Sequence, residues 1–561
     1  MKLRIGILLT VLMTLPLLSA GPETTPVRQE SFAGVYYVSQ NRGQDVPDAG
    51  TRQRPWKSLA YAVSRVPTAE PPSRIAILVA RGEYPVNALT LKENLALLGG
   101  FDDDFARRDI FQYRSILDGR GKDRLLIAAE GAQIDGFVII NGRIRGKGGA
   151  VFCNGVSCII TNNVFRNNTT LSPQPWNPQY RHEIANDGGA IYAQSGSAPV
   201  IENNLFVENF TEVGRGAAIA LHGRCRGVIR GNVFLNNTTG LSDPKRSSDG
   251  GAVSVFDWSR PIIEENIFLG NRALNRNDAG GLFVALWSSP VIQRNIFVNN
   301  YCDDDGGALF VGGQEHRYDR PLDPLPASDD FFVTISRNLF IGNENPSKNS
   351  GAMRMTMETR GRFVNNITAM NTGIYFQRSE VEVVNNTILD DFLFVETKAG
   401  LRKGKIVNNI ILGRFDLQVE AMVSKNLLPS PAAENNLSGE PLFIDDWLEI
   451  KAEKVTFDPT RAITEIYSSR ATFSPDALVG RVVHAGGKWG VVETNTIRSI
   501  RIWGDLSGEV HFFVLPTYHL RPDSPGVDQG DGRFTPQTDM DGEARPAGQG
   551  VDIGADEVTP G

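Results

Sequence analysis

The sequence predicts an all-β protein whose main part is a single-stranded parallel β-helix, and three observations support this fold class. Gly-Gly-Ala, or a close variant, recurs before short apolar runs such as AIYA, AVSV and ALFV. After a turn, each run is followed by an Asn-x-Phe element or a variant of it. Where the repeat is shortest, Asn366, Asn386 and Asn409 are 20 and 23 residues apart. A repeat of this length, built from short strands, is typical of a β-helix in which each coil buries its apolar face against the next.

The recurring asparagine is expected to occupy the same bend in every coil. Stacked coils place equivalent residues about 4.8 Å apart, so we expect the asparagines to form hydrogen-bonded ladders and the phenylalanines to stack. Longer intervals between repeats indicate loop insertions. The asparagine column contains Asn163, Asn204, Asn232, Asn266, Asn295, Asn338, Asn366, Asn386, Asn409 and Asn426.

The other segments of the chain are predicted from the positions at which this repeat begins, is interrupted and ends. Residues 448–517 interrupt the period with alternating apolar strands separated by Gly-containing turns, which predicts a small β-rich insertion. The predicted segments are a signal peptide at 1–20, an entry and cap segment at 21–120, β-helix coils with loop insertions at 121–447, the insertion at 448–517 and a closing segment at 518–561.

The first twenty residues, MKLRIGILLTVLMTLPLLSA, have the pattern of a secretory signal. Lys2 and Arg4 precede an apolar run that ends in small residues, and a cut after Ala20 is expected. A retained membrane anchor is the alternative, but the apolar run is short for a spanning helix. No later segment is apolar enough to span a bilayer. We therefore expect a protein that is secreted, periplasmic or on the cell surface.

Composition narrows the expected partners. The formal net charge of −7 argues against a nucleic-acid partner, because phosphate binding requires a basic face. The four cysteines, Cys153, Cys158, Cys225 and Cys302, fit no zinc-binding spacing. The first two lie close enough in sequence to bridge a turn, and buried free thiols are the alternative. We expect a monomer.

The repeated elements resemble those of the right-handed parallel β-helix, or pectin-lyase-like, superfamily. The N-terminal stretch VYYVSQNRGQDVPDAGTRQRPWKSLAYAV and the C-terminal stretch SPGVDQGDGRFTPQTDMDGEARPAGQGVDIGADE are similar to the terminal segments of secreted bacterial members. The resemblance implies a short amphipathic helix, at about Trp56–Val66, that covers the first coil and its unpaired strand edges. It covers most of the chain, but it is specific for the fold and matches no single enzyme family.

One face of the Gly-Gly-Ala strands is expected to present side chains to solvent. Alternation after the second glycine places Tyr192, Arg354 and Val284 in an outward row, with Phe283 inward. The next outward row contains Gln194, His222 and Arg378, and loop insertions at both edges are expected to add further side chains. We interpret this face as a carbohydrate-binding surface, although scattered exposed aromatics are ordinary on proteins. The candidate substrate-binding residues are Tyr192, Gln194, Trp258, Trp287, Arg378 and His316.

The position before each glycine pair forms a charged column with two interpretations. Aligned on the second glycine, it contains Lys147, Asp187, Arg215, Asp249, Ala279 and Asp305. The first interpretation is a salt-bridge ladder of alternating sign from Lys147 to Asp249. The second follows from the resemblance: related polysaccharide lyases hold Ca²⁺ with clustered carboxylates, while Lys or Arg removes the proton α to a uronate carboxyl. The run from Asp303 to Asp305 has no basic partner in the same register, so it is the better cation or acid/base candidate.

These observations lead to three functional hypotheses. The first is an enzyme acting on an acidic polysaccharide, a Ca²⁺-assisted lyase being favoured over a hydrolase. The second is a non-catalytic polysaccharide-binding protein, and the third is a structural or adhesive cell-surface protein. The expected signatures of β-helix hydrolases and of the main pectate lyase family are absent. The candidate catalytic residues are Arg215, Arg354, His222 and Asp305, and the candidate metal ligands are Asp249, Asp278, Asp303 and Asp304.

A second group of acids lies near the C-terminus. Asp539, Asp541, Asp552, Asp556 and Glu557 are close together in sequence. Asp-Gly turn chemistry is the favoured interpretation, because Asp side chains accept hydrogen bonds from nearby backbone N–H groups. A structural cation is the alternative.

Overall fold

The computed structural model describes residues 21–22, 32–172, 186–240, 249–313, 331–347, 349–395, 404–429 and 435–559. The chain folds into two compact units. One contains Asp446–Thr517, and the other contains Ala20–Asp445 together with Tyr518–Gly561. The predicted signal peptide, residues 1–20, lies outside the described residues. Among the described residues, no helix is long and apolar enough to cross a membrane.

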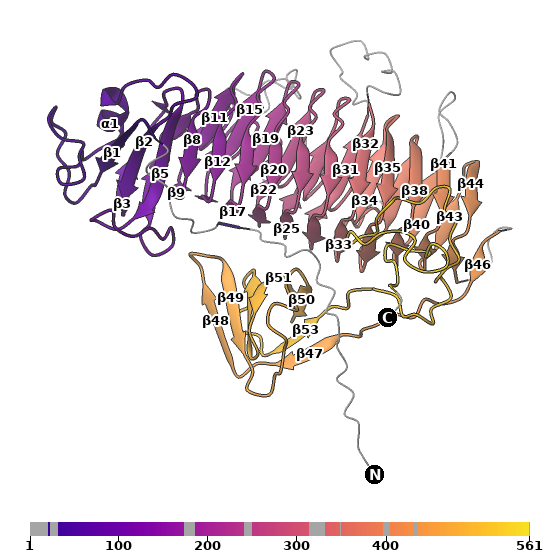
Figure 1. Cartoon of the computed structure of the whole chain (residues 1–561). Helices are drawn as coiled ribbons and strands as arrows, with labels where there is room; N and C mark the ends of the chain where they lie inside the picture. Colours follow the sequence, from indigo (N-terminus) through magenta and orange to yellow (C-terminus); the bar gives the residue numbers. More distant parts are fainter. Residues whose placement is uncertain are drawn as a thin grey trace. The chain divides into compact units, whose positions relative to one another are not determined.

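The larger unit is a stack of coils whose strands pair in parallel with those of the next coil (Figure 1). Each coil gives one strand in turn to three long sheets, here named C, A and B, and several coils add a short strand to a fourth sheet, D. The parallel β-helix expected from the repeat is therefore confirmed.

Sheet A contains β1 (Gly34–Val38), β2 (Ile75–Ala80), β5 (Leu95–Phe101), β8 (Gln133–Asp135), β12 (Ile159–Thr161), β16 (Val200–Glu202), β20 (Val228–Arg230), β24 (Ile262–Glu264), β28 (Val291–Gln293), β32 (Val333–Ser336), β35 (Arg360–Val364), β38 (Glu380–Val384), β41 (Gly404–Val407) and β44 (Ala421–Ser424). Sheet B contains β3 (Gly82–Pro85), β6 (Ser115–Asp118), β9 (Phe137–Ile140), β13 (Val164–Arg166), β17 (Leu205–Val207), β21 (Val233–Leu235), β25 (Ile267–Leu269), β29 (Ile296–Val298), β33 (Leu339–Ile341), β36 (Ile367–Ala369), β39 (Thr387–Ile388), β42 (Ile410–Ile411), β45 (Leu427–Leu428) and β46 (Leu437–Ser438).

Sheet C contains β4 (Leu89–Thr90), β7 (Leu126–Ile127), β11 (Val151–Asn154), β15 (Ile191–Gln194), β19 (Ile219–His222), β23 (Val253–Phe256), β27 (Leu282–Val284), β31 (Leu309–Gly312), β34 (Met353–Thr356), β37 (Ile374–Gln377), β40 (Phe392–Val395) and β43 (Phe415–Leu417). Sheet D contains β10 (Arg143–Ile144), β14 (Thr169–Thr170), β18 (Phe210–Thr211), β22 (Thr238–Thr239), β26 (Arg272–Ala273) and β30 (Tyr301–Cys302).

The first coil is covered by a short helix, α1 (Leu59–Arg65), which is shorter than the predicted Trp56–Val66. The Ser58 side chain accepts a hydrogen bond from the backbone N–H of Tyr61 and caps the helix N-terminus. Leu59, Ala62 and Val63 are its buried residues. The helix lies at the β1 end of the stack (Figure 1), as expected for a cap.

The asparagine column forms the predicted ladder inside the coils. At each step an Asn Nδ2 donates to the Oδ1 of the next Asn, as from Asn232 to Asn266 at 3.0 Å and from Asn266 to Asn295 at 2.9 Å. The ladder runs from Asn163 through Asn426 and extends one step further, to Asn436. The predicted phenylalanine stack is also present: neighbouring rings from Phe165 to Phe340 have centroids 4.6–5.0 Å apart.

A second ladder, five residues further along each coil, ends on an acid. It runs from Asn168 through Asn209, Asn237, Asn271, Asn300, Asn343 and Asn371. Asp390 then accepts from Asn371 through Nδ2 at 2.7 Å and through the backbone N–H at 2.8 Å. Burial raises the pKa of Asp390 to about 6.

We expect Asp390→Asn to stabilise the protein above pH 6. Because its pKa is raised in the folded state, Asp390 binds a proton more tightly there than in the unfolded chain. Protonation of Asp390 therefore stabilises the folded state. This contribution is fully present below about pH 4 and is lost as the pH rises through about 6. In urea unfolding, the free energy of unfolding of the variant should therefore exceed that of the wild type by up to about 3 kcal/mol at pH 8 and by much less at pH 4. Asp391→Asn, at the exposed neighbour, should keep the wild-type pH dependence. An equal gain at both pH values would show that ionisation of Asp390 is not the cause.

The smaller unit is an antiparallel sheet in which β53 pairs with β47 and β50. Its strands are β47 (Leu448–Lys451), β48 (Lys454–Asp458), β49 (Ile463–Tyr467), β50 (Val482–Ala485), β51 (Lys488–Asn495), β52 (Ser499–Trp503) and β53 (His511–Val514). A separate apolar core that includes Val483, Ile502 and Phe512 lies within it. A cavity of about 420 Å³ lies beside β47, lined in part by Lys451, Arg470 and Phe473.

Candidate functional site

The candidate site is formed by the outer face of sheet C and by the charged column, whose residues lie just before the strands of that sheet. Strand register corrects the alignment of this column at one coil. Leu282 pairs with Val253 and Phe283 with Ser254, so Phe283 faces outward and Val284 inward. The residue in the charged column is consequently Asp278, and Ala279 is not part of it. The column is Lys147, Asp187, Arg215, Asp249, Asp278 and Asp305.

Aspartates in this column bind the backbone of the next coil. Asp187 Oδ1 accepts from the Arg215 N–H at 2.8 Å, and Asp249 Oδ1 accepts from the Asp278 N–H at 3.1 Å. Asp278 Oδ1 accepts from the Asp305 N–H at 3.0 Å. These three aspartates therefore help to hold neighbouring coils together. Within the column, Arg215 and Asp187 also form an ion pair, at 3.6 Å.

A group of five side chains, here called the relay, lies at the start of this column. Lys147 Nζ donates to the Tyr192 hydroxyl at 3.0 Å, and that hydroxyl lies 3.0 Å from His222 Nδ1. Asp187 Oδ2 lies 3.8 Å from the same nitrogen, and Arg215 lies beyond Asp187. His222 stands on β19, and its pairing with Gln194 on β15 brings it beside Tyr192.

Burial differs sharply across the relay. The side chains of Asp187 and Arg215 are 3% and 5% exposed, whereas that of His222 is 22% exposed. Tyr192 is fully buried, and burial raises its pKa. The phenol therefore stays protonated near neutral pH. His222 and the half-buried Lys147 are the members that reach the surface.

Three carboxylates gather further along the same column. Asp278, Asp304 and Asp305 each offer an oxygen, and these oxygens lie within 4.8 Å of one another. Arg354 Nη1 lies 3.4 Å from Asp305 Oδ1, so Asp305 has the basic partner that the sequence alignment did not supply. The guanidinium is held by Gln377 and by the ring of Tyr375, whose centroid is 3.8 Å away.

Two of the predicted metal ligands lie outside this group of carboxylates. Asp249 binds the backbone N–H of Asp278, as described above. Asp303 accepts hydrogen bonds from the Tyr301 hydroxyl at 2.7 Å and from the backbone N–H of Asn275. The hydrogen bond to Asp303 raises the pKa of Tyr301 to about 12. Asp303 and Asp249 are therefore engaged in local structure.

Burial contradicts two of the three aromatic residues that were predicted to bind substrate. Tyr192 and Trp287 are fully buried, and the outward-facing Phe283 and Phe310 are 2% exposed. The rings of Phe283 and Phe310 pack on one another outside the coil interior, with centroids 5.2 Å apart. Buried rings offer no face on which a sugar can stack.

The other predicted binding residues have varied positions. Trp258 lies half-buried in the turn after β23, and Gln194 donates to Asn154 at 3.0 Å. Arg378 pairs with Glu358 at 3.4 Å, and its side chain is 34% exposed. His316 lies outside the described residues. The four cysteines are buried thiols, with the sulfurs of Cys153 and Cys158 3.2 Å apart.

Comparison with known proteins agrees with this architecture. The family described as "Right handed beta helix region" matches residues 125–318, the part of the chain that carries the relay and the carboxylates. The larger unit is a right-handed parallel β-helix. No curated protein sequence matches that of this β-helix protein.

Two solved structures match this chain over most of their length. One is described as the complex structure of XylC with xylose; it is 10% identical, with 94% of this chain and 99% of that chain covered and a TM-score of 0.38. The other is a double mutant of the tailspike protein of E. coli bacteriophage HK620, also 10% identical, with 86% and 94% covered and a TM-score of 0.27. Neither likeness assigns a residue role to this chain.

Proposed function

We propose that this β-helix protein acts on a uronate-containing polysaccharide by β-elimination on the outer face of sheet C. The observation that carries the proposal is the relay in which Lys147, Tyr192 and His222 are joined by contacts of 3.0 Å and Asp187 lies behind the imidazole. A Lys, Tyr and His in mutual contact at a partly exposed surface supply a cation, a fixed hydroxyl and a base.

The contacts of His222 support its role as the base. The Tyr192 oxygen accepts from Lys147 Nζ and lies 3.0 Å from His222 Nδ1, where the ring tautomer decides which atom donates. As part of the proposal, we place the hydrogen of the neutral ring on Nδ1. That tautomer puts the lone pair of the neutral ring on Nε2. Asp187, 3.8 Å from Nδ1, stabilises the imidazolium that forms after proton transfer. Arg215, ion-paired with Asp187, positions the carboxylate from behind.

The reaction at this site balances without an oxidant or reductant. His222 takes the proton from the uronate carbon next to the carboxyl group, and the electrons of that C–H bond form a carbon–carbon double bond. The glycosidic C–O bond breaks, and the leaving oxygen takes a proton from solvent. Lys147 offsets the charge that the uronate carboxylate accumulates as its neighbouring carbon loses the proton.

Calcium fits the second part of this face in donor type. Asp278, Asp304 and Asp305 present oxygen atoms only, which is the set that Ca²⁺ prefers. Arg354 and the Asp305 N–H already offset part of their charge. Bound Ca²⁺ would supply positive charge to another uronate of the same polymer. With coils about 4.8 Å apart, a chain lying along the helix axis would pass both groups.

The test is to incubate the full-length protein with a panel of uronate polysaccharides and follow the ultraviolet absorbance of unsaturated products, with Ca²⁺ and then with chelator. We expect product formation and a loss of at least about 10²-fold in its rate for His222→Gln. His484→Gln, in the smaller unit, is the matched control and should keep the wild-type rate. No unsaturated product and no new reducing ends would refute the enzyme proposal for those substrates and leave polysaccharide binding or a structural role. Secretion and a monomeric state accompany the proposal and are checked by fractionation and light scattering.

A further inference from the structure

The chain segment that leaves the larger unit pairs with the segment that returns to it. The chain leaves the larger unit after Asp445 and returns at Tyr518. Just before and after, Phe443 and Leu520 form an antiparallel bridge, and the Ile444 N–H donates to the His519 carbonyl at 2.9 Å. His519 therefore stands in the larger unit, where the outgoing and returning chains pair.

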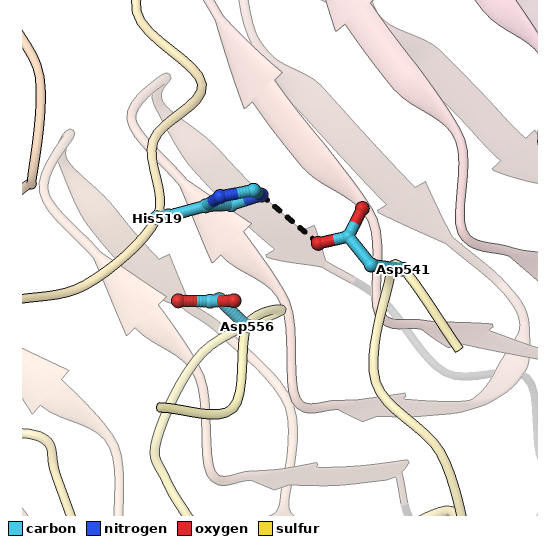
Figure 2. Close-up of side chains that lie close together, drawn as sticks. All are labelled: His519, Asp541 and Asp556. Atoms are coloured by element: carbon cyan, nitrogen blue, oxygen red, sulfur yellow. Dashed lines mark ion pairs between the residues drawn. The ribbon is translucent and has the colours of Figure 1, made fainter. Parts of the chain in front are cut away.

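At this point three metal-ligating side chains from separate parts of the C-terminal segment converge (Figure 2). His519 Nε2 lies 2.9 Å from Asp541 Oδ2. Asp556 lies beside them, and one ligand atom from each residue lies within 4.8 Å of the others. Asp556 also accepts from the Leu520 N–H at 2.8 Å, which ties the returning chain to this group.

The group is buried and its negative charge exceeds its positive charge. The side chains of His519 and Asp541 are 17% and 10% exposed, and Asp556 is 7% exposed. Asp445 also acts electrostatically on the imidazole of His519, so three carboxylates act on it, and Asp539 acts on Asp556. Two further cations act on these carboxylates. Arg337 acts on Asp541 while its Nε donates to the Met540 carbonyl, and Arg545, which is paired with Glu557, acts on Asp556. Even with His519 protonated, the carboxylates around it carry more negative charge than the cations offset.

One carboxylate oxygen in the group is not satisfied. Asp541 Oδ1 is buried and has no hydrogen-bond partner among the residues that the structure describes. A buried carboxylate oxygen left in this way is costly, because it has lost its water and gained nothing. Its partner oxygen, Oδ2, holds His519. A cation bound beside Asp541 would satisfy the carboxylate and balance the acidic excess together.

We propose that His519, Asp541 and Asp556 bind a divalent transition-metal ion of the zinc class. One imidazole nitrogen and two carboxylate oxygens are a Zn²⁺ or Co²⁺ donor set, whereas calcium takes oxygen donors only. Three protein ligands leave the remaining coordination to water. Two positive charges balance the carboxylates of Asp541 and Asp556 when His519 is neutral. The ion would fasten the returning chain at Leu520 to the segments that carry Asp541 and Asp556. This site is separate from the relay and does not depend on the proposed function.

The experiment uses the full-length protein, stripped with EDTA and then titrated with Co²⁺ or Zn²⁺. We expect about one Co²⁺ to bind per chain. Its visible absorption spectrum should be that of a four- or five-coordinate ion with a nitrogen ligand. Zn²⁺ should displace the Co²⁺ and raise the melting temperature of the stripped protein, because an ion that binds only the folded state stabilises it.

Matched variants locate the site. His519→Gln and Asp556→Asn should each abolish the cobalt spectrum and the zinc-dependent rise in melting temperature. His484→Gln, at a histidine of the smaller unit, and Asp304→Asn, in the carboxylate group on sheet C, should retain both. A stripped wild-type protein that gives no cobalt spectrum and no zinc-dependent rise would overturn the proposal, whether or not the variants fold. An unchanged spectrum in His519→Gln would also overturn it.

Discussion

Arg545→Met is expected to destabilise the β-helix by about 3–5 kcal/mol, the cost of breaking a fully buried ion pair. Arg545 Nη1 lies 2.9 Å from Glu557 Oε2, and neither side chain is exposed. Burial lowers the pKa of Arg545 and raises that of Glu557, yet each is compensated by the other. Removing the guanidinium leaves the buried Glu557 carboxyl group without its counter-ion. It also removes donors to the carbonyls of Asp552 and Gly554.

The urea midpoint and the slope of the unfolding transition measure this effect. Arg533→Met is the matched control, because its side chain is 77% exposed and water screens its pair with Asp531. A double variant, Arg545→Met with Glu557→Met, should recover part of the loss but not all, since Glu557 also accepts from the N–H groups of Ala547 and Asp552. Equal losses in the two single Arg variants would show that the buried pair carries no special weight.

The β-helix itself was predictable because its stabilising contacts repeat along the sequence. One asparagine and one phenylalanine per coil must meet their equivalents in the next coil, so spacing alone indicates the stack. The sequence also contains a signal for the second ladder: an asparagine lies five residues after each first-ladder residue from Asn163 to Asn366. Turn formation near the C-terminus was also predictable. Asp539 accepts from the N–H groups of Asp541, Gly542 and Glu543, as expected of an aspartate that opens a turn.

The candidate site was predictable only in part, because alternation gives a face but not what packs over it. Phe283 and Phe310 face away from the coil interior and are still buried, so their direction did not make them binding residues. The alignment slip at Asp278 arose because Ala-Gly-Gly replaces Gly-Gly-Ala there, and only strand pairing shows which glycine is equivalent. His519 meets Asp541 and Asp556 in a segment without a repeat, and no spacing rule brings those residues together.

Asn266→Ala in the middle of the first ladder is expected to cost about 3–5 kcal/mol, because several buried groups lose partners at once. Asn266 Nδ2 donates to the carbonyls of Ile229 and Glu264 and to Asn295 Oδ1, each at 2.9 Å. Its Oδ1 accepts from the backbone N–H and the Nδ2 of Asn232. The Asn232 N–H has no water to replace the lost acceptor, since both asparagines are fully buried.

Urea unfolding of three variants separates the ladder from any other role of asparagine. Asn154→Ala removes an exposed asparagine that accepts from Gln194, and it should change the stability by less than about 0.5 kcal/mol. Asn436→Ala removes the last step of the ladder, where the residue is only half-buried, and should fall between the two. The expected order of the three losses in stability follows from the number of buried polar groups that each substitution leaves without a hydrogen-bond partner. If the end and the middle of the ladder cost the same, neither burial nor the number of groups left without partners would determine the loss, and the prediction would be wrong.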